Sequence, residues 1–382
     1  MKALPRTLDE TYDRILGSIE EQYREAAHTA LQWLAFSVRP LRLEEIVEVV
    51  AVVLGGSTGF LDERPSNPQD ALGICSSLVT ISSNSNDELS DTSNDGLSDA
   101  SNDDLSDTSN KQTSQIYLAH YSVKEYLTSD RILAGSASAF ACFETSANRN
   151  ITELCLTYLS SLERPDTLTY GSLTAFPLFS YASRFWFKHA QTANEEMGLD
   201  PVIVKFLNEA KSLILLNRLL DVHPSYEGEA FFRITPSKVG SPLYYASYYG
   251  LSRVAAMLAE GGADVNAQGG DYGNALQAAA YNSEDVSLIK LLLEAGADVN
   301  AQGGKYGNAL QAAAKASNML TVKLLLEAGA DVNAQGGHYG NALQAAIWNR
   351  ENVTVMKLLL KAGALSTFSV KSMTMLYSLQ YY

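Results

Sequence analysis

The apolar positions of the first forty residues recur at helical spacing. From Leu8 to Leu34 a hydrophobic side chain follows every three or four residues, as on one face of an α-helix. Thr7 and Glu10 have the spacing of a capping box at the start of this segment, and Pro40 interrupts the pattern after its end. The pattern therefore predicts one helix from about residue 8 to residue 34.

The next segments alternate between helical and strand-like patterns. Residues 43–54 and 69–76 are predicted helices, and residues 78–81 and 116–119 are short strand-like runs. Three helices and a hairpin are typical of a winged helix, which we predict for residues 1–135. Amphipathic segments at 151–162, 178–189 and 202–220 then predict a helical spacer over residues 136–238, with an aromatic cluster in its core that comprises Phe179, Phe185 and Trp186.

The C-terminal part of the chain repeats itself. Three segments share the pattern YGNALQAA followed by KLLL and AGA, and a looser copy precedes them. The equivalent leucines Leu243, Leu276, Leu310 and Leu343 lie 33, 34 and 33 residues apart, which is the ankyrin period. We therefore predict ankyrin repeats over residues 239–382, with units at about 240–270, 271–304, 305–337 and 338–370. The fold class is mainly α: winged helix, helical spacer and ankyrin solenoid.

The residue chemistry of each repeat agrees with this prediction. A short helix of small residues allows close stacking, and a second helix ends in an apolar block. Gly296, Gly329 and Gly363 follow that block. A residue with left-handed backbone closes the helix there, and only glycine adopts this conformation without steric cost. The ADVNAQGG stretch is then the hairpin to the next unit. A single unit cannot bury its apolar face alone, so the units must stack.

Comparison of the repeats indicates which positions are free for recognition. The residues that stay the same, such as Tyr272, Gly273, Asn274 and Leu276, are consistent with a scaffold role. The positions that vary at the hairpin tip and at the end of the first helix are candidates for partner binding, unless they vary simply because they are exposed. Aromatic side chains among them favour an interface. The candidates are Tyr248, Asp271, Tyr281, Lys305, Lys315, His338 and Trp348.

Two segments have no clear place in this scheme. Residues 370–382 are apolar and aromatic where a solenoid needs a polar cap, so either this tail folds over the end of the array or the array is cut short. Residues 85–110 consist of copies of an eight-residue unit. The whole segment contains eight acidic and no basic side chains. Such a segment cannot bury enough apolar surface to become ordered, and we predict a disordered insert at the tip of the wing.

Charge and cysteine content exclude several classes of function. The net charge of -15 disfavours binding to nucleic acid or to anionic membranes. The three cysteines, Cys75, Cys142 and Cys155, are far apart and suggest neither disulfides nor a zinc site. No signal peptide or membrane-spanning run is present in the pattern. We expect a cytoplasmic protein without metal or other cofactor.

Several segments, taken together and in order, resemble one family. They look like the region downstream of the nucleotide-binding domain in fungal NACHT-ankyrin proteins, which are NOD-like receptor relatives of the STAND class. The matching segments are LPRTLDETYDRIL, LQWLAFSVRPLRLEEIVEVVAV, ICSSLVTI, IYLAHYSVKEYLTSDRI and FPLFSYASRFWFKHA. Winged helices of this kind are often labelled as the GPI inositol-deacylase type, and we infer no such activity from the label.

The resemblance implies a role for one residue. In NACHT receptors a histidine of the winged helix contacts the phosphates of bound ADP and keeps the receptor closed. His120 lies at the matching place, although Lys124 stands where the family often has glutamine. The alternative is a structural histidine at a strand-to-helix turn. Because the chain has no phosphate-binding Gly-rich loop of the Walker type, the resemblance leaves His120 a nucleotide sensor only toward a NACHT domain in trans.

Two further functions have weaker support. Gly55 to Gly59 satisfies the Gly-x-Ser-x-Gly pattern of a serine hydrolase, but the helix that should follow is replaced by FLDERP, and the histidines available to it, His120 and His189, lie in the predicted winged helix and spacer. A winged helix can also bind DNA, but the acidic insert lies on the wing that would approach the phosphates. We expect a non-enzymatic protein that binds a protein partner through the concave ankyrin surface.

Overall fold

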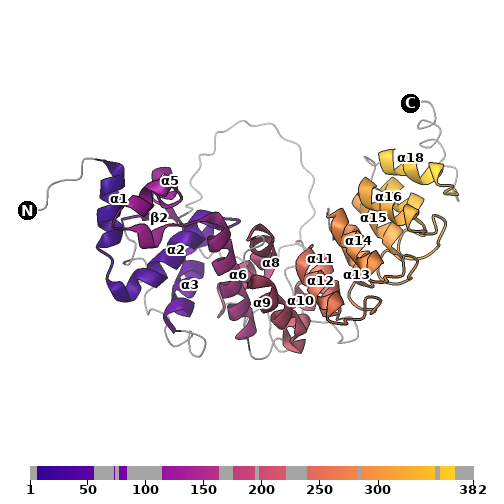
Figure 1. The fold of residues 1–382 in the computed structure, drawn as a ribbon, viewed down its shortest axis with the longest axis horizontal. Helices are drawn as coiled ribbons and strands as arrows, with labels where there is room; N and C mark the ends of the chain where they lie inside the picture. Colours follow the sequence, from indigo (N-terminus) through magenta and orange to yellow (C-terminus); the bar gives the residue numbers. More distant parts are fainter. Residues whose placement is uncertain are drawn as a thin grey trace, which may run out of the picture. The chain divides into compact units, whose positions relative to one another are not determined.

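The computed structural model describes residues 7–55, 73, 77–83, 114–162, 175–193, 198–220, 239–282, 285–348 and 353–365 (Figure 1). This part of the chain is mainly α-helical, which confirms the predicted class. It divides into two compact units, Met1–Ile151 and Thr152–Tyr382, and the division falls within one helix. The predicted helix at 69–76, except Gly73, the acidic insert at 85–110 and the tail at 370–382 lie outside the described residues.

The first unit combines helices with a small sheet. Its elements are α1 (Leu8–Gly17), η1 (Glu21–Tyr23), α2 (Arg24–Phe36), β1 (Leu41–Arg42), α3 (Leu43–Gly55), β2 (Val79–Ser83), β3 (Ser114–Leu118), α5 (Tyr121–Leu127), η3 (Asp130–Ala134), η4 (Ser138–Phe140) and the start of α6 (Glu144–Ser160). The sheet is antiparallel with strand order β1-β3-β2, and Ile116 pairs with Leu41 on one side and Ile81 on the other. Two residues are too few to show a strand pattern, so β1 was not predicted.

The prediction of one helix from residue 8 to residue 34 is wrong. The chain forms α1 and α2 instead, and the break follows Gly17, a weak helix former. The hydroxyl of Ser18 donates a hydrogen bond to the carbonyl of Ile15 (2.6 Å), a local bond that competes with the helix. Apolar residues on both sides of the break pack into the same core, so the hydrophobic pattern runs through it unchanged. The predicted cap at Thr7 is present, because its hydroxyl accepts from the Glu10 amide (3.1 Å).

The core of the first unit joins residues that are far apart in the sequence. Side chains of α1 and α2 pack against residues of α5 and the turns after it; the core includes Tyr12, Leu16, Ala27, Leu31, Leu78, Val123, Tyr126, Ile132, Phe140 and Cys142. Asp13 stabilises the packing of α1 against the turns after α5, since its carboxylate accepts hydrogen bonds from the Ser136 hydroxyl (2.6 Å) and the Ala137 amide (2.7 Å). Burial by itself would raise the pKa of Asp13, but these hydrogen bonds outweigh it and hold the pKa below its usual value.

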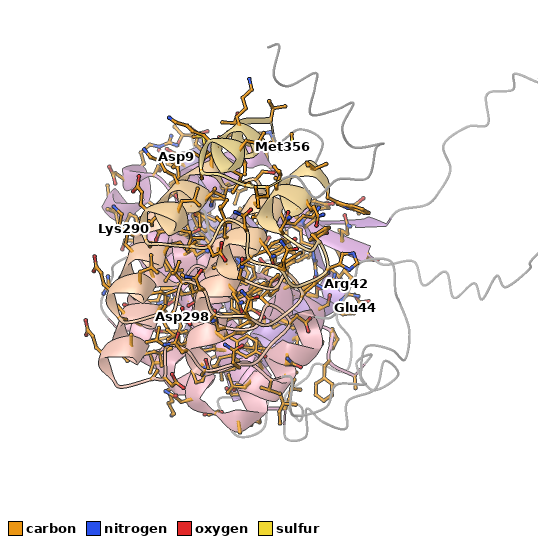
Figure 2. The ribbon with its side chains drawn as sticks, turned by 90° about the vertical axis from the view of Figure 1, so that its right-hand side faces the viewer. Asp9, Arg42, Glu44, Lys290, Asp298 and Met356 are labelled. Atoms are coloured by element: carbon orange, nitrogen blue, oxygen red, sulfur yellow. The ribbon has the colours of Figure 1, made fainter. Side chains whose placement is uncertain are left out.

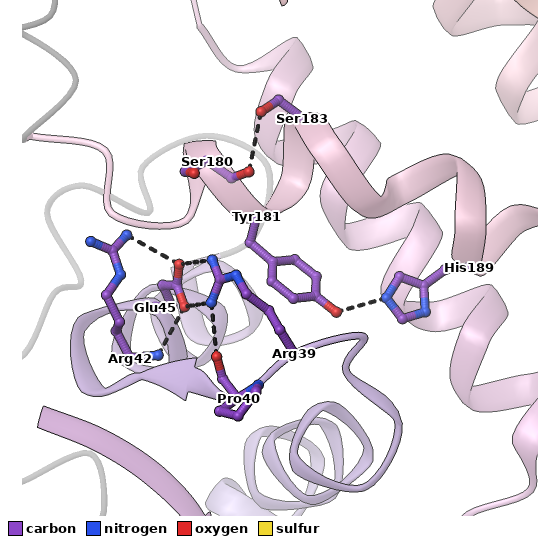
Figure 3. A network of polar contacts seen from close by, with 8 residues as sticks. All are labelled: Arg39, Pro40, Arg42, Glu45, Ser180, Tyr181, Ser183 and His189. Carbon is purple, nitrogen blue, oxygen red and sulfur yellow. Dashed lines mark hydrogen bonds and ion pairs between the residues drawn. The ribbon is translucent and has the colours of Figure 1, made fainter. Parts of the chain in front are cut away.

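A buried ion pair fixes the turn between α2 and α3. The carboxylate of Glu45 is fully buried and accepts two hydrogen bonds from the Arg39 guanidinium (2.6 and 2.8 Å), as well as one from the Arg42 amide (2.8 Å) (Figure 3). Burial would raise the pKa of Glu45, and the arginines outweigh that effect and lower it. The paired arginine offsets the desolvation of the carboxylate, so this group has a structural role.

The second unit begins with the remaining spacer helices. After α6 come α8 (Phe179–Thr192), α9 (Leu199–Asn208) and α10 (Ala210–Leu220). The single helix predicted at 202–220 is therefore two helices, separated at Glu209, whose backbone is extended. Apolar residues on both sides of Glu209 are buried, and the pattern again does not reveal the break. Phe179 and Trp186 are buried as predicted, and Phe185 lies half-buried against Tyr181.

A buried histidine packs within α8. The imidazole of His189 bonds to the Tyr181 hydroxyl at 2.8 Å (Figure 3). The ring is 1% exposed, and burial lowers its pKa to about 4. His189 is therefore neutral at neutral pH and belongs to the core of the spacer.

The ankyrin region consists of successive helix pairs (Figure 1). The pairs are α11 (Pro242–Tyr248) with α12 (Ser252–Glu260), α13 (Ala275–Asn282) with α14 (Val286–Glu294), α15 (Ala309–Ala316) with α16 (Met319–Glu327), and α17 (Ala342–Trp348) with α18 (Val353–Lys361). Apart from Ala316, the alanines of the first helices are buried, which allows the close stacking predicted. Gly296, Gly329 and Gly363 have φ of 93°, 90° and 93°, which confirms the left-handed helix ends.

Asparagine and glutamine side chains tie each repeat to the next. The amide of Asn300 donates to the Gly329 carbonyl (3.1 Å) and its oxygen accepts from the Asp331 amide (2.8 Å); Asn266 and Asn333 make the same pair of bonds one repeat earlier and later. Gln277 donates to backbone carbonyls of the following hairpin in the same way. These bonds satisfy backbone groups that the hairpins leave unpaired, so the array is held by contacts between neighbours.

Candidate protein-binding surface

A continuous row of aromatic rings crosses the ankyrin repeats. We call it the aromatic ladder; its members are Tyr248, Tyr272, Tyr281, Tyr306, Tyr339 and Trp348. Consecutive ring centroids lie between 4.8 and 5.8 Å apart. Three members come from the ends of first helices, and three from the YGN turn before a first helix. Each ring thus contacts a ring of its own or a neighbouring repeat, and the ladder joins all four units.

Hydrogen bonds between hydroxyl groups hold the ladder together. Tyr248 is bonded to Tyr272, and Tyr306 to Tyr281. Burial, followed by the proximity of the other phenols, raises the pKa of Tyr272 well above the ordinary value. The pKa of Tyr306 is raised as well, by burial and then by its bond to Tyr281. The hydroxyls at the centre of the ladder are therefore neutral, and it presents uncharged phenols.

Three basic side chains lie along the later part of the ladder. The Lys305 ammonium is 5.9 Å from the Tyr306 ring centroid, and the Lys315 ammonium is 5.4 Å from that of Tyr339. The ring of His338 meets Tyr339 edge to face, with centroids 5.0 Å apart. Within the described residues no carboxylate pairs with either lysine. The two lysine ammonium groups lie over aromatic faces, and their positive charge is available to a ligand.

The tips of the hairpins are joined in register. The Lys305 amide donates to the Asp271 carbonyl (2.7 Å), and the His338 amide donates to the Lys305 carbonyl (2.9 Å). The Asp271 carboxylate acts on Tyr248, whose pKa is raised first by burial and in part by this charge. The ladder is thus acidic where it begins and basic farther along the array.

The structure brings the seven predicted binding residues into one surface. Tyr248, Tyr281 and Trp348 are members of the ladder, and the remaining four lie at its tips or over its rings. Comparison of the copies missed three members that are the same in the three close copies: Tyr272, Tyr306 and Tyr339. Because these residues do not vary, that comparison assigns them to the scaffold. A tyrosine repeated at the solenoid period must stack on its copies, and that spacing was the signal that could have found the ladder.

His120 lies at the turn from β3 to α5. Its Nδ1 accepts a hydrogen bond from the Ser122 amide (3.1 Å), which caps α5, and it is 2.7 Å from the Ser122 hydroxyl. That hydroxyl also contacts the Tyr12 hydroxyl (2.7 Å), so α1 helps to orient the group. Because Nδ1 accepts, the neutral ring carries its proton on Nε2. His120 is exposed, so this structural cap of α5 remains accessible to solvent.

The hydrolase pattern has little structural context. Gly55 ends α3, and the other residues of the motif, up to Gly59, lie outside the described residues. The two histidines considered for a triad are engaged elsewhere, His120 as a helix cap and His189 in the buried pair with Tyr181. In the described ranges, no group of three or more His, Cys, Asp or Glu side chains could hold a metal ion.

Comparison with known proteins supports the repeat assignment. Residues 275–368 match the family model for ankyrin repeats, in three copies. The preceding unit, with α11 and α12, shares the same backbone bridge after its hairpin, between Gly269 and Gly273. The chain is also similar to the azaphilone pigments biosynthesis cluster protein L of Monascus ruber, with 35% identity over 293 residues. That match covers 73% of this chain and 57% of the relative, so the chain spans little more than half of the relative's length.

Among the described residues, no helix is long and apolar enough to span a membrane.

Proposed function

We propose that this chain is a non-enzymatic, cytoplasmic interaction protein whose ankyrin array binds a protein partner. The observation that carries the proposal is the aromatic ladder, which runs through four repeats and ends in Trp348, a side chain that is 68% exposed. Exposed tryptophan and tyrosine are the side chains most often found at the energetic centre of protein interfaces. A ladder that served stacking alone would have no need to end in an exposed indole.

The proposal is tested by capture of partners with the full chain. Wild-type protein, a ladder variant and a control variant are immobilised and exposed to extract of the native cells. The ladder variant is Tyr281→Ala with Trp348→Ala, and the control is Lys290→Ala with Lys357→Ala; both lysines are exposed on the second helices, and Figure 2 labels Lys290. Proteins retained by the wild type and the control but lost from the ladder variant are expected. Equal retention by all three would refute the proposed surface.

We further propose that the N-terminal unit is a winged helix of the kind that follows the nucleotide-binding domain in NACHT-ankyrin receptors. Its support is the order of elements, in which α2, β1 and α3 precede the antiparallel pair β2 and β3, with β1 as the third strand. In this proposal the array is the sensing arm of a receptor, and a NACHT domain acts in trans.

In the same proposal, His120 contacts a nucleotide only when that nucleotide is bound to a NACHT domain in trans. We expect this chain alone to show no tight binding of ATP and no ATP hydrolysis, since no phosphate-binding loop is found in its sequence. Calorimetry is the direct measurement. A micromolar affinity of this chain for ATP would contradict the proposal.

A role in a biosynthesis cluster is a second candidate. It is supported by the similarity to the Monascus ruber protein, whose name assigns that protein to an azaphilone pigment cluster. This role is compatible with protein binding, because the name states no reaction. Deletion of the gene, followed by measurement of pigments in the culture, tests it: unchanged pigment production would count against it.

A further inference from the structure

The rings of the aromatic ladder present their edges, because their faces cover one another. The planes of Tyr272 and Tyr281 meet at 29°, those of Tyr281 and Tyr306 at 23°, and those of Tyr306 and Tyr339 at 10°. Near-parallel rings at these separations are stacked, and the side chain of Tyr306 between them is only 4% exposed. A ligand can therefore reach the edges of the half-buried rings around Tyr306, but not the stacked ring faces.

This geometry disfavours a stacked ligand. Proteins that bind single-stranded nucleic acid offer free aromatic faces on which bases stack. In the ladder the inner faces are already occupied by neighbouring tyrosines, and Trp348 is the member with a largely exposed side chain. An extended polypeptide fits such a surface better, because backbone carbonyls and side chains can bond to phenol edges without inserting between rings.

The charges along the ladder indicate the sign of the charge that the bound polypeptide carries. Lys305 and Lys315 stand over ladder rings and have no carboxylate partner among the described residues, and His338 lies beside them. The whole chain has a net charge of -15, so this basic stretch is a local exception. An acidic segment would be attracted here and repelled elsewhere on the chain.

We propose that the part of the ladder from Tyr306 to Trp348 binds an extended acidic protein segment, whose carboxylates lie on Lys305 and Lys315 and whose apolar side chain packs on Trp348. This inference rests on the proposed function and deepens it by naming the chemistry of the partner. Asp271, at the acidic start of the ladder, sets the direction: the acidic residues of the segment lie toward the C-terminal repeats.

The test selects peptides without assuming a sequence. A library of random linear peptides displayed on phage is panned on the full chain, and the selected peptides are synthesised with Asp and Glu retained or changed to Asn and Gln. We expect selected peptides to be rich in Asp and Glu, and their amide versions to bind about tenfold more weakly, as loss of two charge pairs implies. Selected peptides of neutral or basic composition would overturn the inference while leaving the proposed function standing.

Variants of the chain locate the site. Lys305→Glu with Lys315→Glu should lower the affinity for the selected acidic peptide at least tenfold. Lys290→Glu with Lys357→Glu makes an equal change of net charge on the second helices and should leave the affinity within about twofold of the wild type. The charge-removing pair Lys305→Gln and Lys315→Gln, with melting temperature as a folding check, guards against a variant that fails to fold. Equal losses in the ladder pair and the second-helix pair would place the binding elsewhere and overturn the inference.

A competing ligand class is measured in the same assay. If an oligonucleotide of fourteen thymidines binds more tightly than the acidic peptide, the ligand is a nucleic acid and the inference is wrong. If panning enriches no peptide at all, the inference of an extended segment is wrong, and the proposed function is decided separately by the capture experiment with the ladder variant.

Discussion

The ankyrin array and the N-terminal unit are stabilised in opposite ways. In the array the bonds between units join a residue to the neighbouring repeat, about thirty positions away, as when Asn266 bonds to Gly296 and Asn300 to Gly329. In the N-terminal unit the decisive contacts join the two ends of the unit, as when Asp13 bonds to Ser136. The array is a sum of equivalent local interfaces, whereas the N-terminal unit has a single core that no segment forms alone.

This difference has a consequence for function. Because the repeats share one scaffold, the side chains that point away from it can vary without loss of the fold, and they line up on one surface. The N-terminal unit has no such repetition, and its polar groups, such as Glu45 with its arginines, are used to hold the fold itself.

Truncation of a core side chain in the N-terminal unit should cause the greatest loss of stability and should leave the array unaffected. Trp33 in α2 is fully buried, so Trp33→Ala should lower the free energy of unfolding of the N-terminal unit by about 4 kcal/mol. Hydrogen exchange read by mass spectrometry should show lost protection before residue 151 and unchanged protection from residue 239 onward. If the array loses protection to the same extent, the two regions are one cooperative core and the comparison fails.

Mild acid should destabilise the protein through His189 in the spacer. His189 has a pKa of about 4 in the folded chain against about 6.5 unfolded, so its contribution is complete above pH 6.5 and is lost as the pH falls toward 4, by about 3 kcal/mol in all. His189→Gln should flatten the fall in melting temperature between pH 7.5 and pH 4.5. An equally steep fall in this variant would assign the acid sensitivity to other groups.

Two glycines of the array measure how closely its repeats approach. Gly304 and Gly296 both have positive φ, 62° and 93°, but a Cβ on Gly304 would lie 2.1 Å from the Tyr272 carbonyl oxygen, whereas one on Gly296 would meet nothing within 4 Å. Both alanine variants are strained by the backbone conformation, at about 1 kcal/mol. Gly304→Ala should cost about 2 kcal/mol more, and chemical denaturation of the two variants gives the difference. Equal costs would mean that the hairpins can separate freely.

The smallest expected effect concerns a single tie between repeats. Asn300→Ala removes the bonds to Gly329 and Asp331, and should destabilise the array by about 1 kcal/mol. Its hydrogen exchange should rise locally at the hairpins on either side. We expect no loss of protection in the N-terminal unit. Such a loss would show that the bonds of Asn300 stabilise parts of the chain beyond the adjacent repeats.

The sequence predicted the array almost completely because every unit repeats the same local rules. Period, helix pairs and left-handed glycines could be read from it, and so could the seven variable residues that the structure gathers along the ladder. The role of Tyr272, Tyr306 and Tyr339 was missed, since a residue that is the same in all three close copies looks like scaffold when each repeat is considered by itself.

The N-terminal unit and the spacer were harder to predict, because their folds do not repeat one local rule. The helix breaks at Gly17 and Glu209 leave the hydrophobic spacing intact, because residues on both sides face the same core. Strand β1 contains only two residues, and its existence depends on pairing with β3, more than seventy positions away. Long-range pairing of this kind leaves no periodic signal in the sequence.

Binding of a partner along the aromatic ladder should leave a footprint of protected backbone amides. Hydrogen exchange of the full chain should be compared with and without the captured partner or selected peptide. We expect protection in residues 271–281, 305–315 and 338–348, and none in α14, α16 or α18. Protection confined to those second helices or to the N-terminal unit would contradict it.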